Sequence, residues 1–424
     1  MSKNIITDVN GRMVFDSRGM PTVEAEIYVN NQLSASAIAP SGASKGKKEA
    51  HEKKDNKEKF IGNSVDENIS IINNEIKDNL IGLNVEDQKI IDKRLIKLDG
   101  TINKSKFGSN TTIAISMATL RAASKSNKVS LWEYLNIEKK KFLPIPEIQI
   151  IGGGAHAKGS IPIQDFMIIP NGAADFYTAL HWVFKVYRKA GEKLHESKNL
   201  FGVADEGGYW PNFRNITLVL DFLTQTIIDA GFIPFKDVSI SLDIAANNFK
   251  ENDQYRISNE EELVSSTKLY EILLSLINKY PIISIEDPFA EEDIEHFAKL
   301  KNNSPSYLQI VGDDLVVTNS ELIQKAVDKN AINSVLIKPN QIGTITEAYD
   351  ALSLSNKLGL MSILSARSGD SEDNFISDLS VGWNMKQLKV GSFSRSERLS
   401  KWNQCLRIGE KFSNQYAMHK IWNF

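Results

Sequence analysis

Cysteine is almost absent from this chain of 424 residues, which contains Cys405 and no other. One thiol cannot close an intramolecular disulfide, and it cannot supply the several thiolates of a cysteine-based metal site. A chain without a disulfide framework fits a reducing compartment. We therefore expect a cytoplasmic protein whose chemistry depends on other residue types.

The sequence also lacks long apolar runs and any excess of one charge. Its beginning, MSKNIITDVNGR, has no apolar stretch typical of a secretion signal, and no later run approaches the ~20 residues that cross a membrane. Fifty Lys and Arg against 53 Asp and Glu give a formal net charge of −3. No basic surplus favours nucleic acid or an anionic lipid surface. We expect a soluble protein with no nucleic-acid partner and no membrane partner.

What the sequence does contain begins with a strand pattern. Residues 22–29 (TVEAEIYV) alternate apolar and polar side chains, which predicts a half-buried strand. The turn residues NNQ follow, and 33–40 (LSASAIAP) complete a hairpin. Residues 41–60 are crowded with Lys and Glu and predict a mobile loop that runs into a solvated helix.

Helical spacing replaces the strand pattern from residue 64. Ile69, Ile72, Ile76 and Leu80 recur on one helix face, behind a cap at Ser64 or Asp66. Residues 110–127 predict a second helix, and the charged segment NIEKKKFLPIP then marks a domain boundary. We assign residues 1–140 to a smaller N-terminal α+β domain and residues 141–424 to a second domain.

The second domain repeats a cycle of short apolar strand, loop and helix-length segment. Nearly uninterrupted apolar runs are typical of buried parallel strands. Six such runs in succession favour a TIM-like (β/α)8 barrel, whose functional site lies at the carboxyl ends of its strands. The runs are 238–243, 281–287, 308–314, 332–338, 361–368 and 387–391.

Three successive runs end in acids, namely Asp243, Glu286 and Asp313. One acid at a strand end usually caps a following helix. Three in register on neighbouring strands would bring their carboxylates to one spot, where they would repel one another unless a cation neutralised them. Oxygen ligands without His or Cys nearby favour Mg²⁺.

Two lysines follow the acids, Lys338 and Lys389. An ammonium close to a divalent cation is destabilised, so such a lysine can act as a base, while a second lysine can stay charged and stabilise negative charge on a substrate oxygen. This combination describes removal of a proton next to a carboxylate. The alternative is that both lysines only form salt bridges with the acids.

Further candidates lie upstream. Glu206, in DEGGYWPN, precedes two glycines and is a candidate general acid for a leaving group. Asp165 in IPIQDFM and His156 in GGGAHAKG are each ambiguous alone, because a lone Asp often caps a helix and a lone loop His is often exposed. GASKGKK is not a phosphate-binding P-loop, because three residues separate its glycines where that motif needs four, and Lys48 replaces Ser or Thr.

These motifs, in this order and over nearly the whole chain, resemble the enolase (phosphopyruvate hydratase) family. The matching segments are FDSRGMPTVE, APSGAS, NKSKFGSN, DEGGYWPN, SIEDPFAEED, VGDDLVVTN, LIKPNQIGT, RSGDSED and SRSERLSKWNQCLRI. The resemblance implies a small N-terminal domain on a modified eight-fold barrel. It also implies a homodimer or a multiple of dimers, and a small phosphorylated carboxylic acid as substrate.

The resemblance also implies roles for single residues. Lys338 would be the base that removes the C2 proton of 2-phosphoglycerate, and Lys389 would bind the substrate carboxylate. Glu206, with Asp165, would help to expel the C3 hydroxyl as water. The tighter of two Mg²⁺ ions would be held by Asp243, Glu286 and Asp313, and the second, which arrives with the substrate, by Ser44. The substrate would also be bound by Gln164, His156, Arg367 and Ser368.

Four positions depart from the family pattern. Ala366 stands where enolases have a His before Arg-Ser, and Asp165 stands where they have a Glu one methylene longer. Lys45 replaces the Thr of the first loop, and Gly152 replaces an Asn. Loss of one positioned acid–base group typically costs about 10²–10⁴-fold in rate.

These departures leave three hypotheses open. The first is an Mg²⁺-dependent lyase that converts 2-phosphoglycerate or a close analogue to phosphoenolpyruvate. The second is a specialised paralogue with the same first step on another phosphorylated or phosphonate substrate, of the type that forms carboxyphosphonoenolpyruvate. The third is a non-catalytic binding protein, against which the intact acids and lysines argue.

Overall fold

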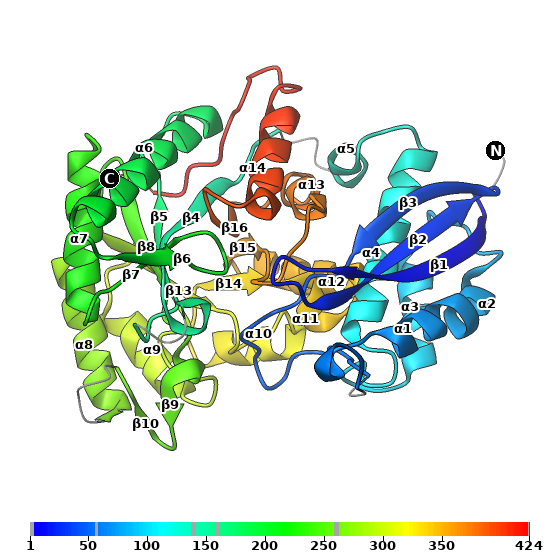
Figure 1. Cartoon of the computed structure of the whole chain (residues 1–424), viewed down its shortest axis with the longest axis horizontal. Coiled ribbons are helices and arrows are strands. Elements are labelled where there is room, and N and C mark those ends of the chain that lie inside the picture. Colours follow the sequence, from blue (N-terminus) through cyan, green and yellow to red (C-terminus); the bar gives the residue numbers. More distant parts are fainter. Residues whose placement is uncertain (1–3, 56–57, 137–140, 158–160, 258–262, 423) are drawn as a thin grey trace.

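The structure is a computed structural model that describes residues 4–55, 58–136, 141–157, 161–257, 263–422 and 424. The predicted domain boundary falls partly on residues 137–140, which lie outside the described residues. Figure 1 shows the N-terminal sheet and its helices on one side of the molecule and a larger barrel on the other. Among the described residues, no helix combines the length and apolar character needed to cross a membrane.

The N-terminal domain is built on a three-stranded antiparallel sheet. Its strands are β1 (Ile6–Phe15), β2 (Pro21–Val29) and β3 (Gln32–Ile38), in that spatial order. The predicted strand and hairpin are confirmed, and Val23, Ala25 and Ile27 are fully buried as their alternation requires. β1 is an addition to the prediction, because its polar sequence lacks a clear apolar pattern.

Helices cover one face of this sheet. The longest, α4 (Ser109–Ser126), packs on β2 and β3 and confirms the predicted second helix. The predicted helix up to Leu80 is present in three pieces, and its side chains Ile72, Ile76 and Leu80 are fully buried. The pieces are α1 (Asp66–Ile71), the π-helical η2 (Ile72–Ile76) and α2 (Lys77–Leu80); η1 (Lys59–Gly62), α3 (Gln88–Asp99) and α5 (Leu131–Leu135) complete the domain.

The start of α1 differs from the prediction. Neither Ser64 nor Asp66 is its main cap. The carboxylate of Asp55, from the preceding loop, accepts the backbone N–H groups of Asp66 at 2.8 Å and Glu67 at 3.2 Å. Ser64 Oγ adds a longer contact of 3.4 Å to the Asp66 N–H. A carboxylate at this end of a helix satisfies donors that have no intrahelical partner.

The predicted barrel is confirmed. Eight strands of the described chain form a closed ring, because β16 pairs with β4 as well as with β15. In ring order these are β4 (Ile145–Gly152), β5 (Asp165–Ile169), β8 (Ser239–Asp243), β12 (Ile282–Glu286), β13 (Gln309–Gly312), β14 (Ser334–Ile337), β15 (Met361–Ser365) and β16 (Gln387–Ser392). β5 runs antiparallel to both of its neighbours, whereas the other neighbouring pairs of the ring are parallel.

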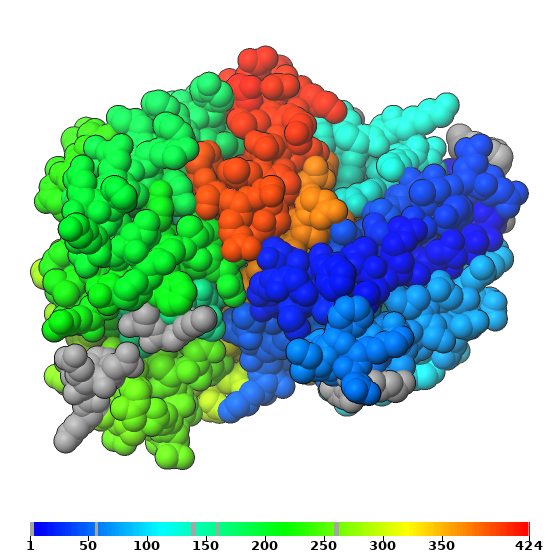
Figure 2. All heavy atoms as spheres, in the orientation of Figure 1, coloured from blue at the N-terminus to red at the C-terminus, as the bar shows by residue number. Residues whose placement is uncertain are grey.

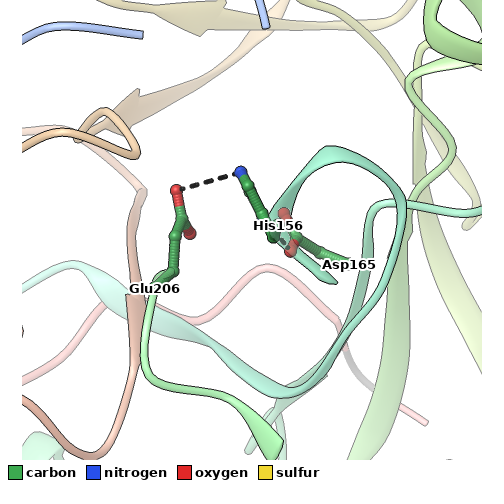
Figure 3. A group of neighbouring side chains, drawn as sticks. All are labelled: His156, Asp165 and Glu206. Atoms are coloured by element: carbon green, nitrogen blue, oxygen red, sulfur yellow. Dashed lines mark hydrogen bonds and ion pairs between the residues drawn. The ribbon is translucent and has the colours of Figure 1, made fainter. Parts of the chain in front are cut away.

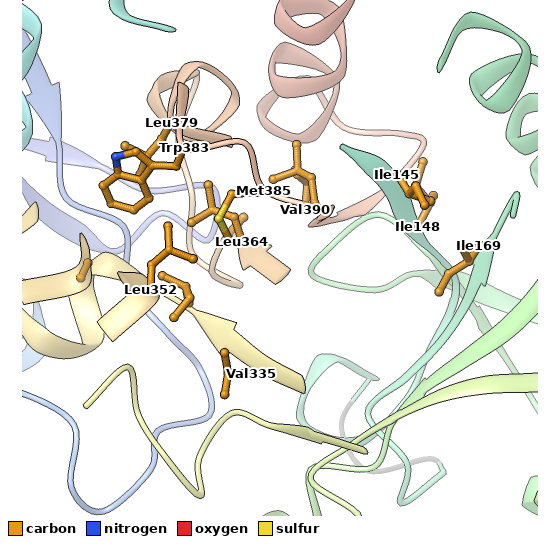
Figure 4. Packing of buried hydrophobic residues seen from close by; sticks show 14 of the residues in the cluster. Ile145, Ile148, Ile169, Val335, Leu352, Leu364, Leu379, Trp383, Met385 and Val390 are labelled. Atoms are coloured by element: carbon orange, nitrogen blue, oxygen red, sulfur yellow. The ribbon is translucent and has the colours of Figure 1, made fainter. Parts of the chain in front are cut away.

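Helices surround the barrel, and side chains on the outer face of its strands pack against them. Leu364 of β15, for example, belongs to the same buried cluster as Leu352 and Leu379, which lie on neighbouring helices (Figure 4). The surrounding helices are α6 (Phe176–Glu196), α7 (Ile216–Asp229), α8 (Ser266–Lys279), α9 (Ile294–Asn303), α10 (Ser320–Asp328), α11 (Pro339–Ile342), α12 (Ile345–Lys357), α13 (Phe375–Gly382) and α14 (Ser396–Gly409). Shorter elements are η3 (Gly154–Ala157), η4 (Ala246–Phe249), β6 (Leu200–Val203), β7 (Tyr209–Pro211), β9 (Lys250–Glu251), β10 (Gln254–Tyr255) and β11 (Val264–Ser265).

The two domains meet at the mouth of the barrel. Figure 2 shows the blue N-terminal residues packed against the orange and red C-terminal segments. A β-bridge joins Ser41 to Gly369, and Arg121 of α4 forms an ion pair of 2.6 Å with Asp373 of the barrel. The N-terminal domain thereby places its loop 41–55 directly over the carboxyl ends of the barrel strands.

Candidate active site

Three buried acids meet at the mouth of the barrel. Asp243 ends β8, Glu286 ends β12, and Asp313 directly follows β13. The register pairs Glu286 with Asp243 across neighbouring parallel strands. Their exposed fractions are 3%, 2% and 6% respectively. Carboxylates buried this closely need cations to offset their mutual repulsion and the loss of water.

Lys389 supplies one of these cations. Its Nζ donates to Asp243 Oδ2 and to Glu286 Oε2, both at 2.7 Å, and lies 3.9 Å from Asp165 Oδ2. Burial alone would lower the pKa of this lysine, but the surrounding carboxylates, led by Asp243 and Glu286, raise it well above its ordinary value. Lys389 is therefore a firmly charged ammonium in this arrangement.

Lys338 supplies the second cation. It follows β14, is buried, and forms a short ion pair with Asp313. Burial acts to lower its pKa, and the carboxylate of Asp313 outweighs burial and raises it. Both lysines thus make the salt bridges that the alternative hypothesis required. Lys338 contacts the acid after the neighbouring strand β13, whereas Lys389 of β16 reaches across the barrel to Asp243 and Glu286.

The acids at the barrel mouth offer free donors for a divalent cation. Glu286 Oε1 has no hydrogen-bond partner in the described part of the chain. Burial, with the nearby charge of Asp243, raises the pKa of Glu286 well above its ordinary value. Asp313 also belongs to a second group, with Asp287 and Asp314, whose ligand atoms all lie within 4.8 Å of one another. Because every donor is a carboxylate oxygen, the residues present fit a hard cation such as Mg²⁺.

The loop of the N-terminal domain closes onto Arg367. Both terminal nitrogens of this arginine donate to the carboxylate of Glu49 at 3.1 Å, and Nη2 also donates to the Ser44 carbonyl at 3.1 Å. Ser368 Oγ accepts the backbone N–H of Ala43 at 2.6 Å. The residues predicted to bind phosphate are therefore together, but in this state they bind the loop itself.

The substituted residue Lys45 lies on the outer side of this loop. Its Nζ forms an ion pair of 2.7 Å with Glu52, which also pairs with Lys54 at 3.0 Å. Although burial would raise it, the charges of Lys54 and Lys45 lower the pKa of Glu52 to about 2. Lys45 therefore contacts a carboxylate of its own loop and adds no charge to the acids of the barrel.

His156, Asp165 and Glu206 form a second buried group (Figure 3). His156 Nδ1 lies 2.9 Å from Asp165 Oδ1, and His156 Nε2 lies 3.8 Å from Glu206 Oε1. Burial lowers the pKa of His156, but the charges of Asp165 and Glu206 outweigh it and raise that pKa to about 9. His156 in turn lowers the pKa of Asp165 to about 2 against the effect of burial. His156 is thus buried between two acids, not an exposed loop residue.

Gln164 joins the two groups. It precedes β5, and its Nε2 donates to Asp243 Oδ2 at 3.1 Å while its Oε1 accepts from Asn248 at 3.1 Å. In this state both ends of the amide are bound by protein. The side chain contacts Asp243 and precedes Asp165 in the sequence, so its position links the strand-end acids with the His156 group.

Ala366 lies at the edge of the site. Its N–H donates to the Lys389 carbonyl at 2.9 Å, and it lines a small cavity of about 40 Å³. The cavity lies between the domains, and its wall includes Pro40 from the N-terminal domain and Asn340 beside Arg367. This cavity is thus close to Arg367, one of the predicted phosphate-binding residues.

Sequence reasoning missed four residues that organise this site. Glu49 neutralises Arg367, and Asp287 accepts the N–H groups of Asp313 and Asp314 at 3.0 and 2.7 Å. Glu147, paired in register with Lys389, accepts from Ser241 Oγ at 2.5 Å. Gln149 contacts Asp165. A sequence pattern could have indicated Glu147 and Gln149. They are polar residues at alternate positions of the apolar segment PIPEIQIIG, which predicts a strand with a polar inner face.

Comparisons with known proteins match both parts of the chain to one family. Residues 6–135 match the family model described as "Enolase, N-terminal domain", and residues 140–422 match "Enolase, C-terminal TIM barrel domain". The protein named Enolase of Pelagibacter ubique (strain HTCC1062) is 44% identical over 422 residues, which cover 99% of this chain and 100% of that protein. The Enolase of Ehrlichia canis (strain Jake) is 42% identical over 96% of this chain and 97% of its own length, and that of Ehrlichia chaffeensis is 43% identical over 95% and 96%.

Proposed function

The chain belongs to the enolase family, and we propose that the lysines and acids at its barrel mouth carry out the dehydration of 2-phosphoglycerate. The protein is a hydro-lyase of enolase type, which forms phosphoenolpyruvate and water from that substrate. The observation that carries our assignment of residues is the meeting of Lys338 and Lys389 with Asp243, Glu286 and Asp313 in one buried cluster.

Lys338 is the base in this proposal. Its Nζ must lose a proton before it accepts the one from C2, and its present ion pair with Asp313 opposes that loss. Asp243, Glu286 and Asp313 would hold Mg²⁺, whose positive charge would offset the negative charge that develops on the substrate when its C2 proton is removed. Lys389, held as an ammonium by its carboxylate partners, binds and orients the substrate carboxylate.

Glu206 and Asp165 assist departure of the C3 hydroxyl. The leaving oxygen needs a proton, and Glu206 is a carboxyl group at the mouth of the barrel that is positioned to deliver one. His156 lies between the two acids, and its charge keeps the pKa of Asp165 low, so Asp165 is ionised. Gln164, which immediately precedes β5, contributes to substrate binding in this proposal.

Arg367 and Ser368 bind the phosphate after their hydrogen bonds to the N-terminal loop have broken. The substrate phosphate has to replace the Glu49 carboxylate on the arginine, since both ends of the guanidinium are occupied. We further propose that Ser44 helps to hold a second Mg²⁺ that arrives with the substrate. Ala366 and Lys45 are altered positions at the edge of the site and on the loop.

Further proposals concern the whole protein. We infer a homodimer or a multiple of dimers from the family relationship, and a cytoplasmic location from the single cysteine. The division at residues 140/141 separates the N-terminal domain from the barrel. No contact of Lys45 or Ala366 in the described chain favours the specialised paralogue or the non-catalytic binding protein over the dehydratase.

A steady-state assay tests the assignment. The wild-type protein with Mg²⁺ and 2-phosphoglycerate should form phosphoenolpyruvate, and Lys338→Ala should lose at least about 10³-fold in kcat because the C2 proton has no acceptor. Lys357→Ala, at an exposed lysine on α12, is the matched control and should keep full activity. A Lys338→Ala enzyme as active as the control would show that another group is the base.

A further inference from the structure

Gln149 is a fully buried amide on the inner face of β4, and its two ends reach different parts of the site. Its Nε2 donates to Asp165 Oδ1 through a short hydrogen bond. Its Oε1 accepts the backbone N–H of Gly208 at 2.7 Å. A backbone N–H needs an acceptor and an ionised carboxylate needs a donor, so these two partners fix the orientation of the amide.

One partner of Gln149 is an acid proposed to act on the leaving group, and the other partner lies close in sequence to the second such acid. Asp165 is the first acid, and Gly208 lies two residues after the second, Glu206, on the same tight turn. One side chain therefore connects the start of β5 with the turn that carries Glu206. Figure 3 shows these acids on opposite sides of His156, from separate segments of the chain.

The same contact determines which oxygen of Asp165 faces the rest of the site. Asp165 Oδ1 receives both Gln149 and His156. Asp165 Oδ2 has no hydrogen-bond partner in the described chain and lies 3.9 Å from Lys389 Nζ. Two contacts on one oxygen favour this orientation of the carboxylate, in which the second oxygen faces Lys389.

Glycines leave the space that Gln149 needs. A Cβ on Gly152 would overlap the side chain of Ala204 and lie 3.3 Å from Gln149 Nε2. A Cβ on Gly208 would crowd Gln149 Oε1. Ser392 Oγ also donates to the Gln149 carbonyl at 2.6 Å, which anchors the residue from β16. The surroundings of this amide are thus shaped to hold it in one position.

We propose that Gln149 is a positioning residue for the dehydration, which sets the distance and the orientation between Asp165 and the Glu206 turn. This inference rests on the proposed function, since it assigns both acids to the departure of the hydroxyl. In the described part of the chain, the side-chain hydrogen bonds of Gln149 go to Asp165 and Gly208, and none goes to the acids proposed to hold the metal. Its loss should slow the chemical step and leave substrate affinity almost unchanged.

Two variants separate this role from simple packing. Gln149→Leu keeps the volume and removes both hydrogen bonds, so we expect kcat to fall about 10–100-fold, as for other residues that orient a catalytic group, with KM within about threefold. Gln149→Glu keeps an acceptor for Gly208 but faces Asp165 with a second carboxylate. Because like charges repel, we expect it to lose at least as much kcat as Gln149→Leu, and to recover part of it as the pH falls and the new carboxyl becomes protonated.

The matched control is Gln387→Leu. Gln387 is another buried glutamine of the barrel interior, whose Oε1 accepts from Gln309 at 2.6 Å, away from the two acids. It should keep kcat within about threefold. Thermal unfolding of each variant shows whether the fold is retained; if Gln149→Leu does not fold, Gln149→Asn, which keeps the amide but cannot span both partners, should show the same loss of kcat with unchanged KM.

The outcomes are distinguishable. A folded Gln149→Leu protein with wild-type kcat overturns the inference and leaves the dehydratase standing. An equal loss in Gln149→Leu and Gln387→Leu also overturns it, because the effect is then one of general packing. A wild-type protein that does not turn over 2-phosphoglycerate overturns the proposed function, and the inference with it.

Discussion

The guanidinium of Arg367 and the carboxylate of Glu49 form a two-pronged ion pair, with each prong 3.1 Å long, between residues 318 positions apart. Both side chains are almost fully buried, at 3% and 7% exposure. Planar pairs of this kind are among the stronger charged contacts in proteins, and a phosphate competes for the same geometry. The loop is therefore held over the barrel by a carboxylate on the arginine that we propose binds the substrate's phosphate.

This relationship predicts that Glu49→Gln increases affinity for phosphate. Without the negative charge, the amide is a weaker competitor for Arg367, so inorganic phosphate should bind more tightly. We expect a gain of about 3–10-fold, because the desolvation of buried charges offsets much of their mutual attraction. Isothermal titration of the protein with inorganic phosphate measures this directly. Glu52→Gln, which removes an acid of the same loop that pairs with Lys45 and Lys54, should show no gain. Unchanged affinity in Glu49→Gln would show that Glu49 does not compete with phosphate.

Restoring an imidazole at position 366 should accelerate the reaction. Ala366 borders a cavity of about 40 Å³ beside the predicted phosphate-binding residues, and a positioned acid–base group contributes about 10²–10⁴-fold when fully effective. We expect Ala366→His to raise kcat at least about tenfold in the steady-state assay. Ala366→Leu adds comparable bulk without a titratable nitrogen and should not raise it. Equal rates in all three proteins would mean that position 366 does not limit turnover.

The buried pair of His156 and Asp165 predicts how stability depends on pH. The pKa of His156 is raised from 6.5 to about 9 in the folded protein. A raised pKa means that this stabilisation is fully present below pH 6.5 and is lost as the pH rises through about 9. A shift of this size corresponds to at most about 3 kcal/mol. Urea unfolding of the metal-free protein between pH 6 and 10 measures the loss.

His156→Gln is the control for that pH dependence. The variant cannot take up a proton, so its free energy of unfolding should be flatter between pH 6.5 and 9 than that of the wild type. On the acid side, Asp165 has a pKa lowered to about 2, so its contribution is present above pH 3.8 and is lost as the pH falls through about 2. Parallel curves for wild type and variant between pH 6.5 and 9 would contradict the assigned ion pair.

Mg²⁺ should stabilise the protein through the acids at the barrel mouth. A ligand present at 100 times its Kd adds about 2.7 kcal/mol to the free energy of unfolding. We expect added Mg²⁺ to raise the Tm of the metal-free protein, and Glu286→Gln to lose most of this increase. Asp378→Asn is a suitable control, because Asp378 is a buried acid on α13 that contacts Gln404 instead of the strand-end acids. An undiminished Mg²⁺ effect in Glu286→Gln would remove Glu286 from the proposed ligands.

The strand-end acids and lysines were predictable because they depend on local pattern and simple topology. An apolar run that stops at Asp243 or Glu286 places the acid at a strand end, and parallel strands collect such ends at one edge. Glu49 and Arg367 could not be paired in this way, since their contact depends on how the two domains dock. The sequence likewise could not predict that Asp55 caps α1, because Asp55 lies eleven positions before Asp66 and reaches the helix N-terminus from a loop.

The direction of β5 and the burial of His156 were also beyond local reasoning. The apolar residues of a strand as short as β5 give no sign of its direction, so the sequence pattern does not reveal that β5 runs antiparallel to its neighbours. His156 lies among glycines, which usually indicates an exposed loop. It is buried because the start of β5 and the Glu206 turn close around it, and both contacts are set by tertiary structure.

The reversed strand has a consequence for how this enzyme can be altered. Because β4 and β5 form a hairpin, the connection between them begins and ends at the catalytic mouth, whereas a parallel strand contributes only its exit. The segment from Gly152 to Asp165, whose two ends pair in the register, is short. It contains three proposed site residues, namely His156, Gln164 and Asp165. That segment is a natural cassette: exchanging it between relatives would transplant three of the proposed site residues at once, and lengthening it would displace all three.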